Sequence, residues 1–199
     1  MSDPVIPYTV PMVRWEPGTL ERLQLSAIEL FEERGYDCTT VADIAARAGL
    51  TERTFYRHFA DKREVLVSGS DELTSMFRTT VSAQPEGTAP LAAVAAALEA
   101  VGTFFEARRP FSQRRQAVIA TSRDLQEREL AKLDGLTAAL TEALGSRGVD
   151  RPLASLVAAV GVAVFHVAFA QWVSGPDGHT FNSYVARALD DLQAQVTVR

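Results

Sequence analysis

The sequence predicts an all-α fold with two units, and three observations lead to this prediction. Apolar residues recur at helical spacing along most of the chain, and the long runs lack the alternation of a half-buried strand. Only 12 glycines and 9 prolines occur among 199 residues. The helical runs are short up to residue 68 and long and rich in Ala and Leu after it. We therefore expect an arm over residues 1–17, a compact helical unit over 18–68 and a larger bundle over 69–199.

The composition is that of a globular protein with a substantial core. Apolar residues make up 47% of the chain, charged residues 23%, and the net charge is -5. The single cysteine, Cys38, excludes an intramolecular disulfide framework and fits a reducing compartment. The first residues lack the basic region and unbroken apolar run of a signal peptide, so a cytoplasmic protein is expected.

Four short helices are expected in the compact unit, because start and stop signals recur at short intervals. Thr40 is the expected N-cap of the second helix, and Gly49 should end that helix. Thr51 should cap the third helix, which runs to about residue 58. Asp61 followed by Glu64 has the spacing of a capping box and should start the fourth.

The larger unit is expected to consist of longer helices separated by Pro and Gly. Its most apolar stretch, Leu153–Val173, approaches the length of a membrane-spanning helix. Ser155, His166 and Gln171 interrupt it, and it lacks a basic flank, so we expect a helix that is buried in its own chain or by a partner subunit, and no membrane partner. The predicted segments are 70–83, 89–108, 111–145, 152–174 and 179–196.

The third short helix carries the strongest functional signal. Two short helices joined by a Gly-containing turn form a helix-turn-helix, whose second helix can enter a DNA major groove. Arg53 could bind a guanine edge, and the methyl group of Thr54 could contact thymine. Phe55 and Phe59 are four residues apart and should face inward. The candidate groove contacts are Thr51, Arg53, Thr54 and Arg57, and the candidate phosphate contacts are Tyr56, His58 and Lys62. From spacing alone, a solvated charged helix in an ordinary bundle stays an equal alternative.

The same region resembles the DNA-binding domain of the TetR family of transcriptional regulators. The match rests on residue types and spacing between Ala27 and Leu66 and is specific only there. It is carried by Ala27-Ile28-Glu29-Leu30-Phe31, Gly35-Tyr36, Thr39-Thr40-Val41, Ile44-Ala45, Ala48-Gly49-Leu50, Thr54-Phe55-Tyr56-Arg57-His58-Phe59, Lys62 and Leu66.

The resemblance implies an N-terminal three-helix helix-turn-helix DNA-binding domain and a C-terminal helical ligand-binding and dimerisation bundle. It further implies a homodimer that binds a palindromic double-stranded DNA operator, usually represses, and is released by a small-molecule effector. Glu52 departs from the pattern, because an acid facing the groove repels phosphate. The arm has only Arg14 as a basic residue, so we expect it to pack on protein. The positions that match the DNA contacts of the family are Thr40, Thr51, Arg53, Thr54, Tyr56, Arg57, His58 and Lys62.

The last two helices, 152–174 and 179–196, are the dimer elements that the resemblance implies. The effector pocket is expected between the central helices. Small residues such as Ala158 and Gly161 would allow close helix contact, although the same face could complete the core of one subunit. Candidate pocket residues are Met76, Phe77, Phe104, Phe105, Ile119, Phe165, Phe169 and Trp172, with Gln116, Arg123, His166 and Gln171 as polar anchors. The Arg108, Arg109, Arg114 and Arg115 cluster could bind an anion, but it is interpreted as a solvated face balanced by nearby acids.

An enzyme is not expected. The sequence has no phosphate-binding glycine motif and no His or Cys pair at metal-ligand spacing, so no cofactor or metal is predicted. The alternative class is a helical ligand-binding or protein-interaction module that no longer reads DNA.

Overall fold

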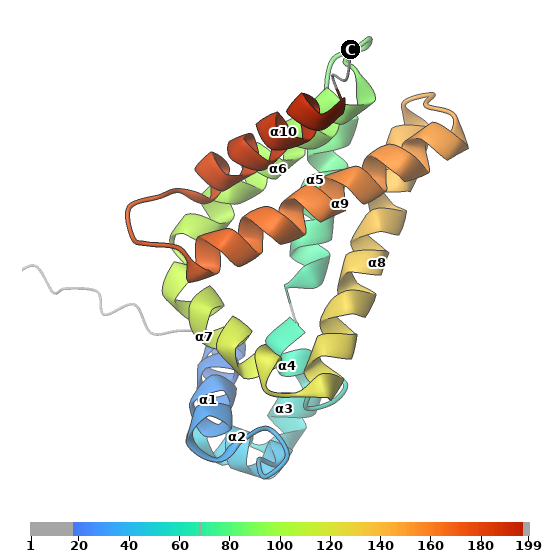
Figure 1. Ribbon diagram of the computed structural model, residues 1–199. Coiled ribbons are helices and arrows are strands. Elements are labelled where there is room, and N and C mark those ends of the chain that lie inside the picture. The colour runs from blue at the N-terminus through green and yellow to red at the C-terminus, as the bar shows by residue number, and fades with distance from the viewer. Residues whose placement is uncertain (1–17, 68, 197–199) are drawn as a thin grey trace, which may run out of the picture.

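The computed structural model describes residues 18–67 and 69–196, and every regular element in these ranges is a helix. A small N-terminal unit, α1–α4, lies at one end of a larger bundle, α5–α10 (Figure 1). The predicted all-α class and two-unit organisation are therefore confirmed. The helices are α1 (Thr19–Arg34), α2 (Val41–Arg47), α3 (Glu52–His58), α4 (Glu64–Val67), α5 (Ser70–Ser82), α6 (Pro90–Glu106), α7 (Arg109–Ala120), α8 (Arg123–Ser146), α9 (Arg151–Ser174) and α10 (Phe181–Val196).

The short helices begin where the capping residues predict. The hydroxyl of Thr40 accepts a hydrogen bond from the Asp43 amide at 3.1 Å, and the Asp43 carboxylate accepts one from the Thr40 amide at 2.9 Å. Thr51 accepts from the Thr54 amide at 3.2 Å. Between these helices Gly49 has φ +66, a left-handed conformation that a residue with a Cβ rarely adopts. This glycine sets the sharp turn between α2 and α3.

The predicted single helix over 111–145 is wrong, because the chain breaks between α7 and α8. Thr121 and Ser122 make the break: the Thr121 hydroxyl donates to the Val118 carbonyl at 2.7 Å, and Ser122 stands at the N-cap of α8. The stop predicted at Arg109–Pro110 is also displaced, since both residues lie in the first turn of α7. Proline is accepted there because the first helical amides need no intrahelical partner.

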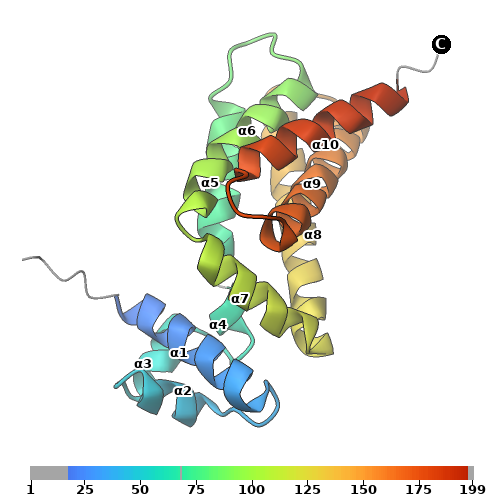
Figure 2. The same ribbon diagram turned by 60° about the vertical axis from the view of Figure 1, so that its left-hand side comes forward.

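Helix α7 joins the two units. It meets α6 at a bend of 97° and crosses between the small unit and the bundle (Figure 2). Val118 and Ile119 of α7 and Leu125 of α8 are buried in the hydrophobic core of the small unit, together with Phe31 and Phe55. The small unit is thus completed by residues from the C-terminal half of the chain.

Helix α9 has two different faces. Its inward face packs small residues against neighbouring helices, and a Cβ on Gly161 would lie 2.3 Å from Cγ1 of Val94 in α6. Its outward face exposes Leu156 and Val167. Among the described residues, α9 is the single helix long and apolar enough to cross a membrane, and only 39% of its apolar window is buried, so the expected burial is only partial within one subunit.

Candidate nucleic-acid interface and ligand pocket

One face of α3 is polar and exposed, and the opposite face holds the helix in the core. Phe55 and Phe59 are buried with ring centroids 5.0 Å apart. Tyr56 is 55% exposed, and Arg53 and Arg57 are exposed on the same short helix. The structure therefore brings the predicted contacts of α3 together on one accessible surface, with Thr51 and His58 at its two ends.

The positive charge available on this surface comes from Arg53 and Arg57. Within the described ranges neither arginine has a hydrogen bond or an ion pair, whereas Arg47 pairs with Glu33 at 2.7 Å. Arg63 pairs similarly with a neighbouring acid, Asp61. Of the basic residues between Arg47 and Arg63, the two at the ends are neutralised by acids, whereas the two arginines on α3 are unpaired in the described structure.

Thr40 is exposed at the start of α2, and Asp43 fixes its orientation. The Thr40 hydroxyl donates to Oδ2 of Asp43 at 2.6 Å, and Arg34 approaches the same oxygen at 2.9 Å. The hydrogen bonds from Thr40, with Arg34, lower the pKa of Asp43 to about 2. The capped end of α2 is therefore held in one geometry at neutral pH.

Lys62 has a structural role that the sequence did not indicate. Its Nζ donates to the carbonyl oxygens of Tyr36 at 2.7 Å and of Thr39 at 2.9 Å, and lies 4.0 Å from the centroid of the Tyr36 ring. Burial lowers the pKa of this ammonium. Two of its three donors thus fix the loop between α1 and α2.

A pocket of about 340 Å³ lies between the small unit and the bundle. Of the twelve predicted pocket residues it includes Phe104, Phe105, Phe165 and Phe169. The other eight lie outside the pocket. Phe77 and Trp172 are buried in the bundle core, and Ile119 is buried in the core of the small unit. The remaining five are exposed or partly exposed: Arg123, His166 and Gln171 are exposed, and Met76 and Gln116 are partly exposed. The full lining is Leu20, Glu21, Gln24, Leu25, Leu66, Gly69, Glu72, Leu73, Phe104, Phe105, Ala107, Arg108, Phe111, Ser112, Arg115, Glu129, Lys132, Phe165 and Phe169.

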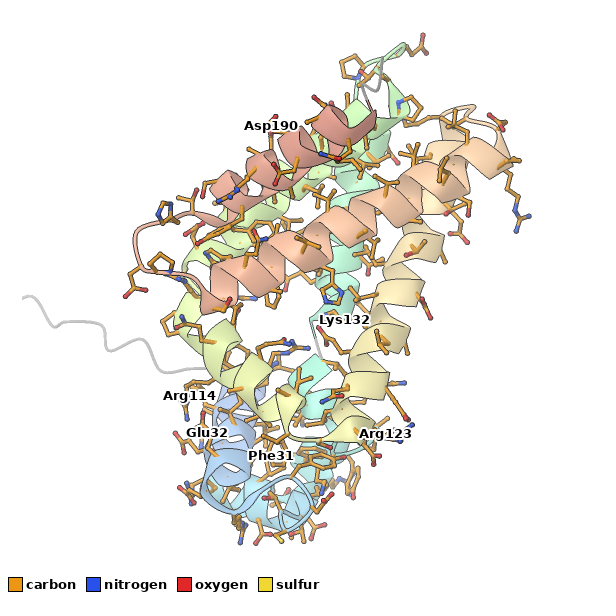
Figure 3. All side chains as sticks on the ribbon, viewed as in Figure 1. Phe31, Glu32, Arg114, Arg123, Lys132 and Asp190 are labelled. Atoms are coloured by element: carbon orange, nitrogen blue, oxygen red, sulfur yellow. The ribbon has the colours of Figure 1, made fainter. Side chains whose placement is uncertain are left out.

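Three charged residues form a polar wall of this pocket that sequence reasoning missed. Arg115, interpreted above as part of a solvated face, is buried and donates to both carboxylate oxygens of Glu129. Lys132, one turn further along α8, lies on the side of the helix that faces α5 (Figure 3). Burial alone would raise the pKa of Glu129, but Arg115 and Lys132 hold it below its usual value. Burial lowers the pKa of Lys132 to about 8, and the nearby Arg115 adds to this.

Arginines of α7 and α8 also connect the bundle to the small unit. Arg115 donates through Nε to the carbonyl oxygen of Leu66 in α4. Arg114 pairs with Glu32 of α1 at 2.6 Å, where the two units meet (Figure 3), and Arg128 pairs with Glu64. The four arginines near the start of α7 therefore do not form one face. Arg109 turns instead to Asp177 and to the end of α9, and Arg108 stacks on Phe104.

Two protein families match the chain, one for each unit. Residues 25–68 match the family described as "Bacterial regulatory proteins, tetR family". Residues 88–197 match the family described as "MftR C-terminal domain".

Individual regulators are similar to this chain in sequence or in fold. The HTH-type transcriptional regulator TcmR of Streptomyces glaucescens is 39% identical over 83 residues, which are 42% of this chain and 37% of that protein. The chain thus matches well under half the length of that relative. The fatty acid degradation regulator FadR of Bacillus halodurans superposes with a TM-score of 0.58 at 19% identity, over 92% of this chain and 99% of that one. FadR of Thermus thermophilus, solved in complex with lauroyl-CoA, superposes with a TM-score of 0.56 at 21% identity, over 90% of this chain and 96% of that one. At such identities the structures show a shared fold.

Proposed function

The chain belongs to the TetR family of transcriptional regulators, and we propose that it acts as a homodimeric repressor that a small-molecule effector releases from a palindromic operator. The observation that carries the DNA-reading part is the exposed face of α3, where Arg53 and Arg57 have no partner among the described residues. Unpaired guanidinium groups on a short exposed helix can bind guanine edges and phosphates without first breaking an ion pair.

The dimer is proposed to form through the outward face of α9. Leu156 is 62% exposed there, with Val167 48% exposed on the same helix. A contiguous apolar strip of this kind is more typical of an interface than of a monomer surface. A two-fold contact between two copies would place two α3 helices at a fixed separation, which is what a palindromic operator requires. The exposed residues of this strip are Leu153, Leu156, Ala159, Ala163, Val167 and Ala170.

The effector is proposed to occupy the pocket of about 340 Å³ between the units. Its lining combines residues of α1 and α4 in the small unit with residues of five bundle helices, α5–α9. An occupant would therefore contact both the DNA-reading unit and the bundle. Changing their relative position is the step that links effector binding to DNA release.

The DNA-reading proposal is tested by selecting duplexes from a random pool and titrating the selected sequence at two salt concentrations. We expect a palindromic sequence whose affinity falls steeply with salt. Arg53→Ala should weaken binding to that sequence by about 1–3 kcal/mol. Arg78→Ala, an exposed arginine on α5 in the bundle, is the matched control and should bind like the unmodified protein. Absence of any enriched duplex would favour the alternative, a ligand-binding or interaction module that no longer reads DNA.

The dimer is tested by sedimentation. Leu156→Glu should shift the protein towards a monomer, because two carboxylates would be buried at the two-fold contact. Leu130→Glu, at a comparably exposed leucine on α8, should leave the dimer intact. A stable dimer in Leu156→Glu would exclude this face as the interface.

A further inference from the structure

The pocket between the two units has a distinctly apolar part. Phe104 and Phe105 of α6 and Phe165 and Phe169 of α9 line it, and the rings of Phe105 and Phe169 lie 5.3 Å apart. Leucine side chains of α1 and α5 add further apolar wall. This part of the pocket offers no buried charge to a ligand and suits an alkyl chain or another apolar group.

Three other residues of the lining carry an excess positive charge. They are Arg115, Glu129 and Lys132, and their side chains are only 9%, 20% and 19% exposed. Two cations thus share one carboxylate. The Glu129 carboxylate is already paired with Arg115, because both of its oxygens accept hydrogen bonds from that guanidinium group. The buried part of the pocket therefore has one positive charge that no protein carboxylate fully compensates.

That charge lies on Lys132. Its Nζ is 3.9 Å from Oε1 of Glu129, which is beyond hydrogen-bond distance, and within the described ranges it donates no hydrogen bond. A largely buried ammonium group is costly unless it is well paired, and the one carboxylate near Lys132, Glu129, is shared with Arg115. The pKa of Lys132 is lowered for the same reason: the effects of burial and of Arg115 outweigh that of Glu129. An anion bound in the pocket would supply the missing acceptor.

The remaining charges of the pocket lie nearer to solvent. Arg108 is exposed and stacks its guanidinium 4.0 Å from the centroid of the Phe104 ring. Glu72 is exposed, and Glu21 is partly exposed and accepts from the Gly18 amide at 3.3 Å. Water screens these groups more strongly than it screens Lys132, so they have less influence on a bound anion.

We propose that the pocket binds an amphiphile with one apolar chain among the four phenylalanines and one anionic group, such as a carboxylate, paired with Lys132. This inference rests on the proposed function, since it names the chemical class of the effector. It also names a route to the DNA-reading unit. An anion beside Lys132 lies next to Arg115, and Arg115 holds the Leu66 carbonyl of α4.

The test uses the purified full chain and isothermal titration with matched probes. Octanoate, laurate and palmitate supply anionic heads on chains of three lengths, the corresponding alcohols supply neutral heads, and alkyltrimethylammonium ions supply cationic heads. We expect a carboxylate to bind about tenfold or more tightly than its matched alcohol, and the cation to bind weakest. Equal binding of carboxylate and alcohol, or no binding of any carboxylate, would overturn the proposal.

Variants locate the anionic head. Lys132→Met should weaken carboxylate binding about tenfold or more and leave alcohol binding unchanged, whereas Lys132→Arg should retain carboxylate binding. Lys132→Met removes the uncompensated charge and leaves the Arg115–Glu129 pair in place, so this variant should fold. Arg108→Met is the matched control at the exposed cation of the pocket and should retain carboxylate binding. Loss in Arg108→Met with retention in Lys132→Met would overturn the assignment.

DNA binding is measured on the same samples without any probe. Operator binding without carboxylate selectivity would refute this inference and leave the proposed regulator function standing. Carboxylate selectivity in a protein that enriches no duplex would support the inference and refute the DNA-reading proposal.

Discussion

Arg114 of α7 and Glu32 of α1 form a two-point ion pair across the junction of the two units, with Nε–Oε1 at 3.0 Å and Nη2–Oε2 at 2.6 Å. The hydrogen bond to Glu32 raises the pKa of Arg114. The pair joins residues 82 positions apart, so it restrains the tertiary arrangement and not the local helix.

We expect this pair to contribute a measurable but modest coupling energy. Both side chains are more than a third exposed, so a double-mutant cycle with Arg114→Ala and Glu32→Ala should give about 0.5–1 kcal/mol in the free energy of unfolding. The pair of Arg123 and Glu127 within α8 is the control and should give less, because it is more exposed and has a single contact. A coupling that does not decrease with added salt would contradict this account.

Glu129 should matter more for stability than its position on a charged helix suggests. Glu129→Gln leaves Arg115 and Lys132 buried without a counter-charge and should lower the free energy of unfolding by about 3 kcal/mol. Adding Lys132→Met should recover part of this loss, since one of the two cations is then gone. Urea denaturation of the single and double variants measures both effects. Additive losses would show that the two residues do not interact.

Lys132 should make stability depend on pH in a defined window. Its pKa is about 8 in the folded protein and 10.5 as the ordinary value, so the unfolded chain binds the proton more tightly. Below pH 8 Lys132 is protonated in both the folded and the unfolded protein, so the full cost of burying its charge lowers stability. From pH 8 to pH 10.5 the folded state has released the proton, so stability should rise with pH by at most about 1.4 kcal/mol per unit.

Lys132→Met is the reference for that measurement, because it removes the titrating group. The difference in the free energy of unfolding between the two proteins should change across this window and be constant below it. The charged groups around Lys132, namely Arg115 of α7, Glu129 of α8, and Glu72 of α5 at the pocket edge, are common to both proteins. His166 of α9, which acts on Glu129, is common as well. A flat difference would show that Lys132 has its ordinary pKa.

Two glycines in long helices should respond to alanine with opposite signs. A Cβ on Gly161 would lie 2.3 Å from Cγ1 of Val94, a stiff and fully buried side chain. Gly161→Ala should therefore destabilise the protein by about 1–3 kcal/mol, although alanine favours the helix. Gly135 of α8 has no atom within 4 Å of such a Cβ, so Gly135→Ala should stabilise by about 1 kcal/mol. Thermal unfolding of both variants checks the contrast.

The local structure of the small unit could be predicted because its signals are local. Thr40 and Thr51 cap helices within three residues of themselves, and the four-residue spacing of Phe55 and Phe59 is enough to assign their face. The break between α7 and α8 was missed, because neither Thr121 nor Ser122 is Gly or Pro, and the Thr121 hydroxyl bonds to the Val118 carbonyl where α7 ends.

The ligand pocket was only half predictable for a related reason. Its phenylalanines stand out in the sequence, but Arg115, Glu129 and Lys132 have the composition of a solvated helical face. What buries them is the meeting of α4, α7 and α8, which no local pattern describes. The expected packing of Tyr8, Val10, Met12 and Trp15 in the arm lies outside the described residues.

The separation of roles on α3 has an evolutionary consequence. Phe55 and Phe59 attach the helix to the core, while Arg53 and Arg57 contribute almost nothing to that attachment because they are exposed and unpaired in the described structure. Substitutions at these exposed positions should leave the folding free energy nearly unchanged. Under the proposed function, descendants of this protein could therefore exchange one operator for another through single mutations, without first acquiring a compensating stabilising change.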